Sequence, residues 1–85
     1  MIDTSLLKIL ILEAAESCYA KGPAWAQERV VLNEIAQRLP DAKKDRKLQE
    51  QILTCWHDFF RQGELSWGHD FDNPNAPWFH VAKRG

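Results

Sequence analysis

Apolar residues crowd the first twenty positions of the chain and predict a helix over about residues 4–20. In LLKILILEAAESCYA they cover more than one stripe of the helix surface, which is typical of a central helix or one covered on two sides. Asp3 or Thr4 offers a capping side-chain oxygen, and Gly22-Pro23 after Lys21 ends the pattern. Because apolar residues cover so much of the helix surface, two alternatives remain. The helix is either purely central, or part of it also forms a dimer or partner surface.

A second helical pattern covers VLNEIAQRLP, residues 31–40. Four apolar residues follow the spacing i, i+3, i+4 and i+7 and share one face: Leu32, Ile35, Ala36 and Leu39. Asn33 is a candidate cap, and Pro40 closes the helix. The preceding RVV, residues 29–31, is rich in β-branched side chains and predicts a short isolated strand.

A long amphipathic helix is expected over roughly residues 43–61, ending at Gln62-Gly63. Its apolar stripe comprises Leu48, Ile52, Cys55, Trp56 and Phe59, with Leu53 and Phe60 beside it. The opposite stripe is polar and is predicted to lie along the exposed side: Lys44, Lys47, Gln51, Thr54 and Asp58.

The last segment predicts a two-stranded hairpin with a long loop. ELSWG and WFHVAK have the composition and alternation of strands, whereas GHDFDNPNAP between them is rich in turn residues. The Asn73-Pro74 and Ala76-Pro77 steps disfavour helix there. We expect Trp67, Phe79 and Val81 to close the core against the long helix.

Length and composition indicate one domain over residues 1–85. Hydrophobic residues make up 45% of the 85, and four are Trp, which argues against disorder. Cys18 and Cys55 are too few for a disulfide scaffold; we expect buried thiols in a reducing compartment, a bridge being the alternative. The apolar run at residues 6–15 contains Lys8 and is too short to cross a membrane. No secretory signal pattern is present, so we expect a cytoplasmic protein without membrane contact.

The order helix, short strand, helix, helix, hairpin resembles a winged helix-turn-helix domain. VVLNEIAQRLP is similar to the second-helix pattern of that family, ILTCWHDFFRQGEL resembles the end of its third helix, and WFHVAKRG resembles its second wing strand. The resemblance covers nearly the whole chain and rests on architecture and spacing. It implies an α+β, mainly helical fold: a three-helix winged helix-turn-helix with a C-terminal two-stranded β-hairpin wing.

The sequence departs from the family pattern at three places. Ala82 stands where the family usually has Thr or Ser. LPDAKKDRK lacks the usual small-residue turn with a Ser or Thr cap, so Asp41 or Asp45 must cap the third helix. Asp70 and Asp72 occupy the wing tip, where DNA-binding members often carry Lys or Arg.

No catalytic or metal-binding pattern is found in the sequence. His57, His69 and His80 lack metal-ligand spacing relative to each other or to cysteine. DFDNPN lacks the later Gly and Glu of a calcium loop, and no nucleophile motif, phosphate-binding Gly loop or nucleotide fingerprint occurs. We therefore expect a protein that is not an enzyme and that has no cofactor and no metal.

The resemblance implies a DNA-binding module, either a small transcription regulator or the DNA-recognition domain of a larger assembly. Its third helix would read double-stranded DNA, with base-edge contacts from Gln51 and Thr54 and phosphate contacts from the cations. The candidate DNA-binding residues are Lys43, Lys44, Arg46, Lys47, Gln51, Thr54, Lys83 and Arg84. The net charge of −1 does not supply the strong basic field of a dedicated nucleic-acid binder.

The alternative is a winged-helix module for protein–protein interaction that uses its aromatic wing. Near-neutral charge, the acidic wing tip and the many aromatic residues favour it, since exposed aromatics anchor interfaces. Phe71 and Trp78, near the tip, are the candidate partner-binding residues. The partner would be another protein or a second copy of the chain, bound through the first helix or the wing.

Overall fold

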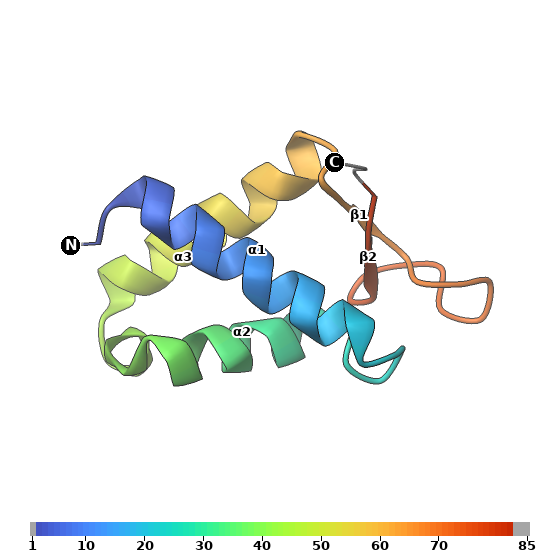
Figure 1. Ribbon diagram of the computed structural model, residues 1–85, viewed down its shortest axis with the longest axis horizontal. Helices are drawn as coiled ribbons and strands as arrows, with labels where there is room; N and C mark the ends of the chain where they lie inside the picture. Colours follow the sequence, from blue (N-terminus) through green and yellow to red (C-terminus); the bar gives the residue numbers. More distant parts are fainter. Residues whose placement is uncertain (1, 83–85) are drawn as a thin grey trace.

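Three α-helices and a C-terminal antiparallel hairpin make up the part of the chain described by the computed structural model, residues 2–82 (Figure 1). The elements are α1 (Thr4–Ala20), α2 (Glu28–Arg38), the 3-10 helix η1 (Pro40–Lys43), α3 (Arg46–Arg61), β1 (Leu65–Trp67) and β2 (Phe79–Val81). The fold is thus α+β and mainly helical, as expected, and its layout is compatible with a winged helix. In Figure 1 the loop between the strands projects away from the helices.

Helix α1 has the bounds that its flanking residues predict. The Asp3 side chain accepts a hydrogen bond from the Ser5 backbone N–H at 2.9 Å, and Gly22 follows the helix with φ 115°. The buried face packs against α2, α3 and β2 and comprises Leu7, Ile11, Ala14, Ala15 and Cys18. Leu6 and Ile9 remain exposed, so the other elements cover only part of the apolar surface of this helix.

Helix α2 begins earlier than its sequence pattern suggests, and the strand expected at residues 29–31 is wrong. These residues form the first turns of α2, which starts at Glu28. Val31 and Ile35 are both fully buried, and a helix places residues four apart on one face. Burial of both therefore favours helix over the strand preference of a β-branched run. Asn33 lies exposed inside α2 and is not its cap.

The only extended pairing near α2 involves its N-cap, Gln27, among the residues that the structure describes. Gln27 forms an isolated bridge with Trp78. The Glu28 N–H donates to the Pro77 carbonyl at 3.0 Å, and the Phe79 N–H donates to the Ala26 carbonyl at 3.0 Å. These bonds fix the second strand of the hairpin to the connection between α1 and α2.

Trp56 of α3 stands at the centre of the core. It is fully buried, and its indole N–H donates to the Glu28 carboxylate at 2.9 Å. Its ring contacts Phe79 edge-on, with centroids 5.4 Å apart. It also contacts Trp67 of β1, so the hairpin packs on α3 through both strands, and the same tryptophan joins α2 to this contact.

The expectation that Trp67, Phe79 and Val81 close the core is confirmed in part. Phe79 is fully buried, and Val81 is half-buried opposite Leu65 in the strand register. Trp67 keeps 36% of its surface exposed and stacks on Phe60, with ring centroids 4.0 Å apart. It covers the outside of the core rather than filling it.

Candidate functional site

The four basic residues expected at the start of the third helix are divided between two elements. Lys43 is the last residue of η1, and Lys44 is its C-cap. Arg46 and Lys47 form the first turn of α3. The prediction that this helix begins near residue 43 is therefore wrong.

The break between η1 and α3 has a local cause. Pro40 begins the 3-10 turn, and Ala42 is buried inside it. Asp45 then adopts an extended conformation, and its carboxylate accepts a hydrogen bond from the Leu48 N–H at 3.1 Å. Asp45 is thus the cap of α3, one of the two aspartates that the sequence offered for this role.

Arg46 and Lys47 point into solvent, with 88% and 86% of their side chains exposed. Glu50, one turn further along, lies 3.4 Å from Arg46 Nε and 3.9 Å from Lys47 Nζ. Exposed ion pairs of this kind contribute little to stability. Cations at a helix N-terminus also oppose the helix dipole, by a few tenths of a kcal/mol. The charges therefore do little for the fold.

Acidic residues surround the basic cluster. The cations are Lys43, Lys44, Arg46 and Lys47, and the nearby acids are Asp41, Asp45 and Glu50. Four positive and three negative charges leave a local sum of +1. The start of α3 is consequently a mixed surface and not a strongly electropositive one.

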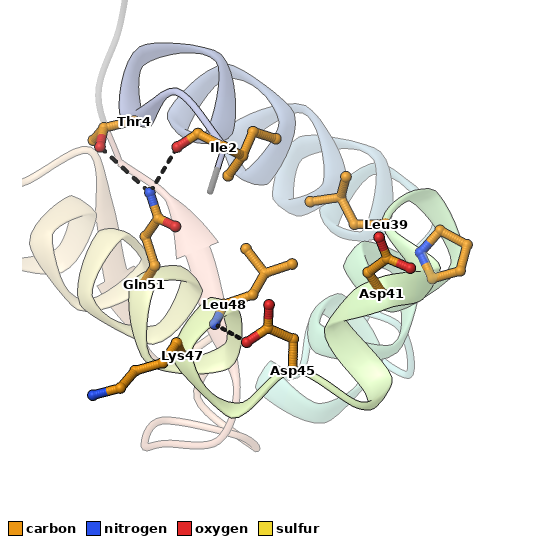
Figure 2. A pocket seen from close by; sticks show the side chains of 9 residues that line it. Ile2, Thr4, Leu39, Asp41, Asp45, Lys47, Leu48 and Gln51 are labelled. Atoms are coloured by element: carbon orange, nitrogen blue, oxygen red, sulfur yellow. Dashed lines mark hydrogen bonds between the residues drawn. The ribbon is translucent and has the colours of Figure 1, made fainter.

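Gln51 does not lie along the exposed side of α3 as predicted. It is half-buried, and its side-chain N–H groups donate to the Ile2 carbonyl at 3.0 Å and to Thr4 Oγ1 at 3.4 Å (Figure 2). Asp58 is also half-buried, whereas Thr54 is exposed. Of the two residues expected to touch base edges, only Thr54 remains presented to solvent. Sequence carries no signal for the bond between α3 and the start of α1.

The second candidate surface is the hairpin loop, residues 68–78. It begins at Gly68, which has φ 97°. A Cβ atom at this position would lie 2.6 Å from the Pro74 carbonyl oxygen. Only glycine fits this close approach of two backbone segments.

The tip of the hairpin loop is held by a turn around Asp70. The carboxylate of Asp70 accepts from the Asn73 N–H at 2.8 Å, and the His69 N–H donates to the Asn73 carbonyl at 2.7 Å. His69 Nδ1 also lies 3.1 Å from the Asp70 carboxylate. The His69 hydrogen bond, followed by that from Asn73, holds the pKa of Asp70 below its ordinary value.

Phe71 is the most exposed large apolar side chain among the described residues. It is fully exposed at the turn and lies between Asp70 and Asp72 in the sequence, which are exposed too. The hydrogen bonds of its neighbours fix the backbone that carries it. The hairpin loop thus presents one aromatic ring in an acidic setting.

Trp78, the other aromatic residue expected near the tip, lies at the base of the hairpin loop instead. It is half-buried, and its carbonyl accepts from the Gly68 N–H at 2.7 Å. His80 Nδ1 donates to the Gly68 carbonyl at the same distance. Trp78 closes the base, so Phe71 alone of the two is presented at the tip. Lys83 and Arg84 lie outside the described residues.

The remaining candidate chemistry is limited. Cys18 and Cys55 are free, buried thiols, as expected, and desolvation raises the pKa of both. Within residues 2–82 no three His, Cys, Asp or Glu side chains are grouped to hold a metal ion. No described helix combines the length and the apolar character needed to cross a membrane.

No family model, curated protein or solved structure matches the chain.

Proposed function

We propose that the chain is a winged-helix protein-interaction module that inserts Phe71 into an apolar pocket of a partner protein. The hairpin is its wing, and the partner's pocket is rimmed by Lys or Arg. The observation that carries this proposal is a fully exposed phenylalanine on a loop fixed by its own hydrogen bonds.

The order of the loop is the first support. Exposed apolar side chains occur singly on many proteins, so exposure alone indicates little. Here Gly68 and the turn between Asp70 and Asn73 determine where Phe71 stands before any partner arrives. Such pre-organisation lowers the entropy lost on binding. Burying a phenylalanine side chain then contributes roughly 1.5–3 kcal/mol.

The charge around Phe71 is the second support, because it selects the partner's chemistry. Asp70 and Asp72 flank Phe71 in the sequence, and the hydrogen bonds to Asp70 lower its pKa and so favour the charged carboxylate. Two carboxylates repel the phosphates of DNA, whereas they attract the Lys and Arg residues around a protein pocket. The hairpin loop therefore favours a basic protein surface.

The test is site-specific photo-crosslinking in cells that express the chain. We would place p-benzoylphenylalanine at position 71 and, as a matched control, at Asn75, which is also exposed in the hairpin loop. We expect one discrete protein adduct from position 71, absent from position 75 and weakened by Asp70→Lys/Asp72→Lys. Binding of the captured protein to Phe71→Ala should then be weaker by about 2 kcal/mol. Equal adducts from both positions, or none, would contradict the proposal.

The start of α3 supports a second candidate function, non-specific binding of double-stranded DNA. The observation in its favour is that Arg46 and Lys47 extend into solvent at the helix end where cations are slightly unfavourable. Charges that do little for the fold are free to neutralise phosphates.

This second candidate is tested by fluorescence anisotropy with mixed-sequence 20-base-pair DNA at low and moderate salt. DNA binding predicts affinity that falls with salt and that is lost in Lys44→Glu/Lys47→Glu. The double variant Asp70→Asn/Asp72→Asn is the control for the hairpin loop. Absence of binding at low salt would eliminate the DNA function for this chain.

A further inference from the structure

A small apolar groove lies between α2 and α3, beside η1. Among the described residues that line it none is charged, and six are apolar: Leu32, Ile35, Ala36, Ala42, Ile52 and Leu53. The seventh is Gln49, whose side-chain N–H donates to the Ala42 carbonyl at 2.7 Å. Leu53 keeps 37% of its surface exposed, so solvent reaches the lining. The groove therefore favours an apolar side chain.

The size of the groove suits one aromatic ring. Pockets for drug-sized ligands measure roughly 300–1,000 Å³. A cavity of about 150 Å³, in contrast, already accepts benzene. The volume between α2 and α3 is about 200 Å³, which is too small for a whole ligand of that kind and large enough for a phenyl ring.

Exposed arginines stand beside the groove on both helices. Arg29 precedes Leu32 by three residues in α2. Arg46 precedes Gln49 by three residues in α3. Residues three apart lie on the same side of a helix, so both arginines border the groove. Arg46 also pairs with Glu50 at 3.4 Å, but this contact is exposed and weak, so a carboxylate of a partner can replace it.

The tip of the hairpin loop has the complementary chemistry. Phe71 is fully exposed and lies between Asp70 and Asp72 in the sequence. It does not reach the groove of its own chain, because the corner of α2 and η1 and the hairpin loop lie at opposite ends of the molecule (Figure 1). Any contact between the two surfaces therefore joins two copies of the chain.

We infer that Phe71 of one copy binds in the groove between α2 and α3 of a second copy. Asp70 and Asp72 then approach Arg29 and Arg46 of that copy, and opposite charges favour this orientation. The inference rests on the proposed function, to which it adds the partner, a second copy of the chain. Each copy offers one ring and one groove, so the contact is head-to-tail.

The first test measures self-association of the full chain by sedimentation velocity over a range of concentrations. We expect the average mass of the native chain to rise with concentration. Phe71→Ala removes the ring and Leu53→Glu places an acid in the groove, so each should weaken the association about tenfold or more. Leu6→Glu makes the same change at another exposed leucine, on α1, and should associate like the native chain.

A mixture of the two variants separates loss of the contact from loss of the fold. Leu53→Glu keeps the ring and Phe71→Ala keeps the groove, so together they should form a complex that neither forms alone. ¹⁵N-labelled Phe71→Ala should show saturable shifts of the Gln49 side-chain amide when unlabelled Leu53→Glu is added. The double variant Leu53→Glu/Phe71→Ala should cause no such shifts.

Three results would overturn the inference: a native chain that stays monomeric, an association that Phe71→Ala leaves unchanged, or a mixture that forms no complex. The proposed function fails separately. It survives a monomeric native chain if photo-crosslinking from position 71 captures a different protein, and it fails if position 71 captures nothing. An adduct with twice the mass of the chain would support both.

Discussion

The start of α3 and the hairpin loop are both exposed, polar and rich in charge, but they are built differently. At α3 four cations lie among three acids, and Glu50 lies within ion-pair distance of both Arg46 and Lys47. In the hairpin loop one carboxylate, that of Asp70, organises the turn, and the next residue, Phe71, is fully exposed. The first surface carries charges on long, exposed side chains, whereas the second carries an exposed aromatic side chain on a hydrogen-bonded turn.

This difference shows which kind of exposed side chain indicates an interaction surface. An exposed lysine or arginine has little effect on the stability of the fold. A basic cluster alone is therefore weak evidence of a binding function. A fixed loop loses conformational entropy when it orders, and here several backbone hydrogen bonds and one obligatory glycine hold it. The hairpin loop is therefore the better candidate for an interaction surface.

The largest expected effect follows from Gly68→Ala. The new Cβ would lie 2.6 Å from the Pro74 oxygen at a positive φ, so we expect a loss of about 2–3 kcal/mol in the free energy of unfolding by urea. Gly63→Ala is the control, since its φ is also positive but no atom lies within 4 Å; about 1 kcal/mol is expected there. Equal losses would mean that the close approach in the loop has no energetic weight.

The next effect concerns the start of α3. Asp45→Ala removes the cap, so the free energy of unfolding should fall by about 1 kcal/mol. Asp45→Asn retains a capping oxygen and should be nearly neutral in the same urea titration. A similar loss in both variants would show that charge at Asp45, rather than its hydrogen bond to Leu48, stabilises the helix.

Glu50→Gln should change stability by about 0.5 kcal/mol or less, because both of its ion pairs are exposed. If α3 binds DNA, the loss of this acid should raise the affinity for duplex DNA about threefold at low salt, measured by anisotropy. Glu13→Gln, an equal change of net charge on α1, is the control. Equal gains in both variants would indicate a general charge effect and no role for the start of α3.

The smallest effect is a pH dependence confined to the hairpin loop. The folded pKa of Asp70 is lowered, so its contribution is present above the ordinary aspartate pKa and is lost as the pH falls through the folded value. We expect the Asn73 amide proton to gain exchange protection as the carboxylate ionises, with a midpoint below that of a free aspartate. Asp72→Asn should leave this midpoint unchanged, and a midpoint at or above that of a free aspartate would contradict the role of Asp70.

The bounds of α1 and the positions of the strands could be predicted because local chemistry specifies them. Asp3 caps α1, Gly22 ends it, and alternating apolar and polar residues mark both strands. The start of α2 could not be predicted, since burial of Val31 with Ile35 overrides the β-branched preference of residues 29–31. The 3-10 turn was missed because the charged residues after Pro40 suit a helix start equally well.

The exposure of a candidate residue could be predicted only where it follows from a turn. Phe71 lies in a polar turn segment and is exposed, as its neighbours suggested. Trp78 was misplaced because its role depends on Gln27, which is far away in the chain. Gln51 was misassigned for the same reason, since its partners belong to the start of α1. Long-range hydrogen bonds of single side chains leave no periodic pattern in a sequence.

The central position of Trp56 also makes the protein its own spectroscopic reporter. Its indole is bonded to Glu28 of α2, and its ring contacts Trp67 of β1 and Phe79 of β2. Trp25, Trp67 and Trp78 emit as well, but they are exposed or half-buried. The fraction of emission that an aqueous quencher does not reach therefore comes from Trp56 and signals that the helices and the hairpin are still assembled. A variant of the hairpin loop that loses binding but keeps the shielded emission has lost its contact surface and not its fold.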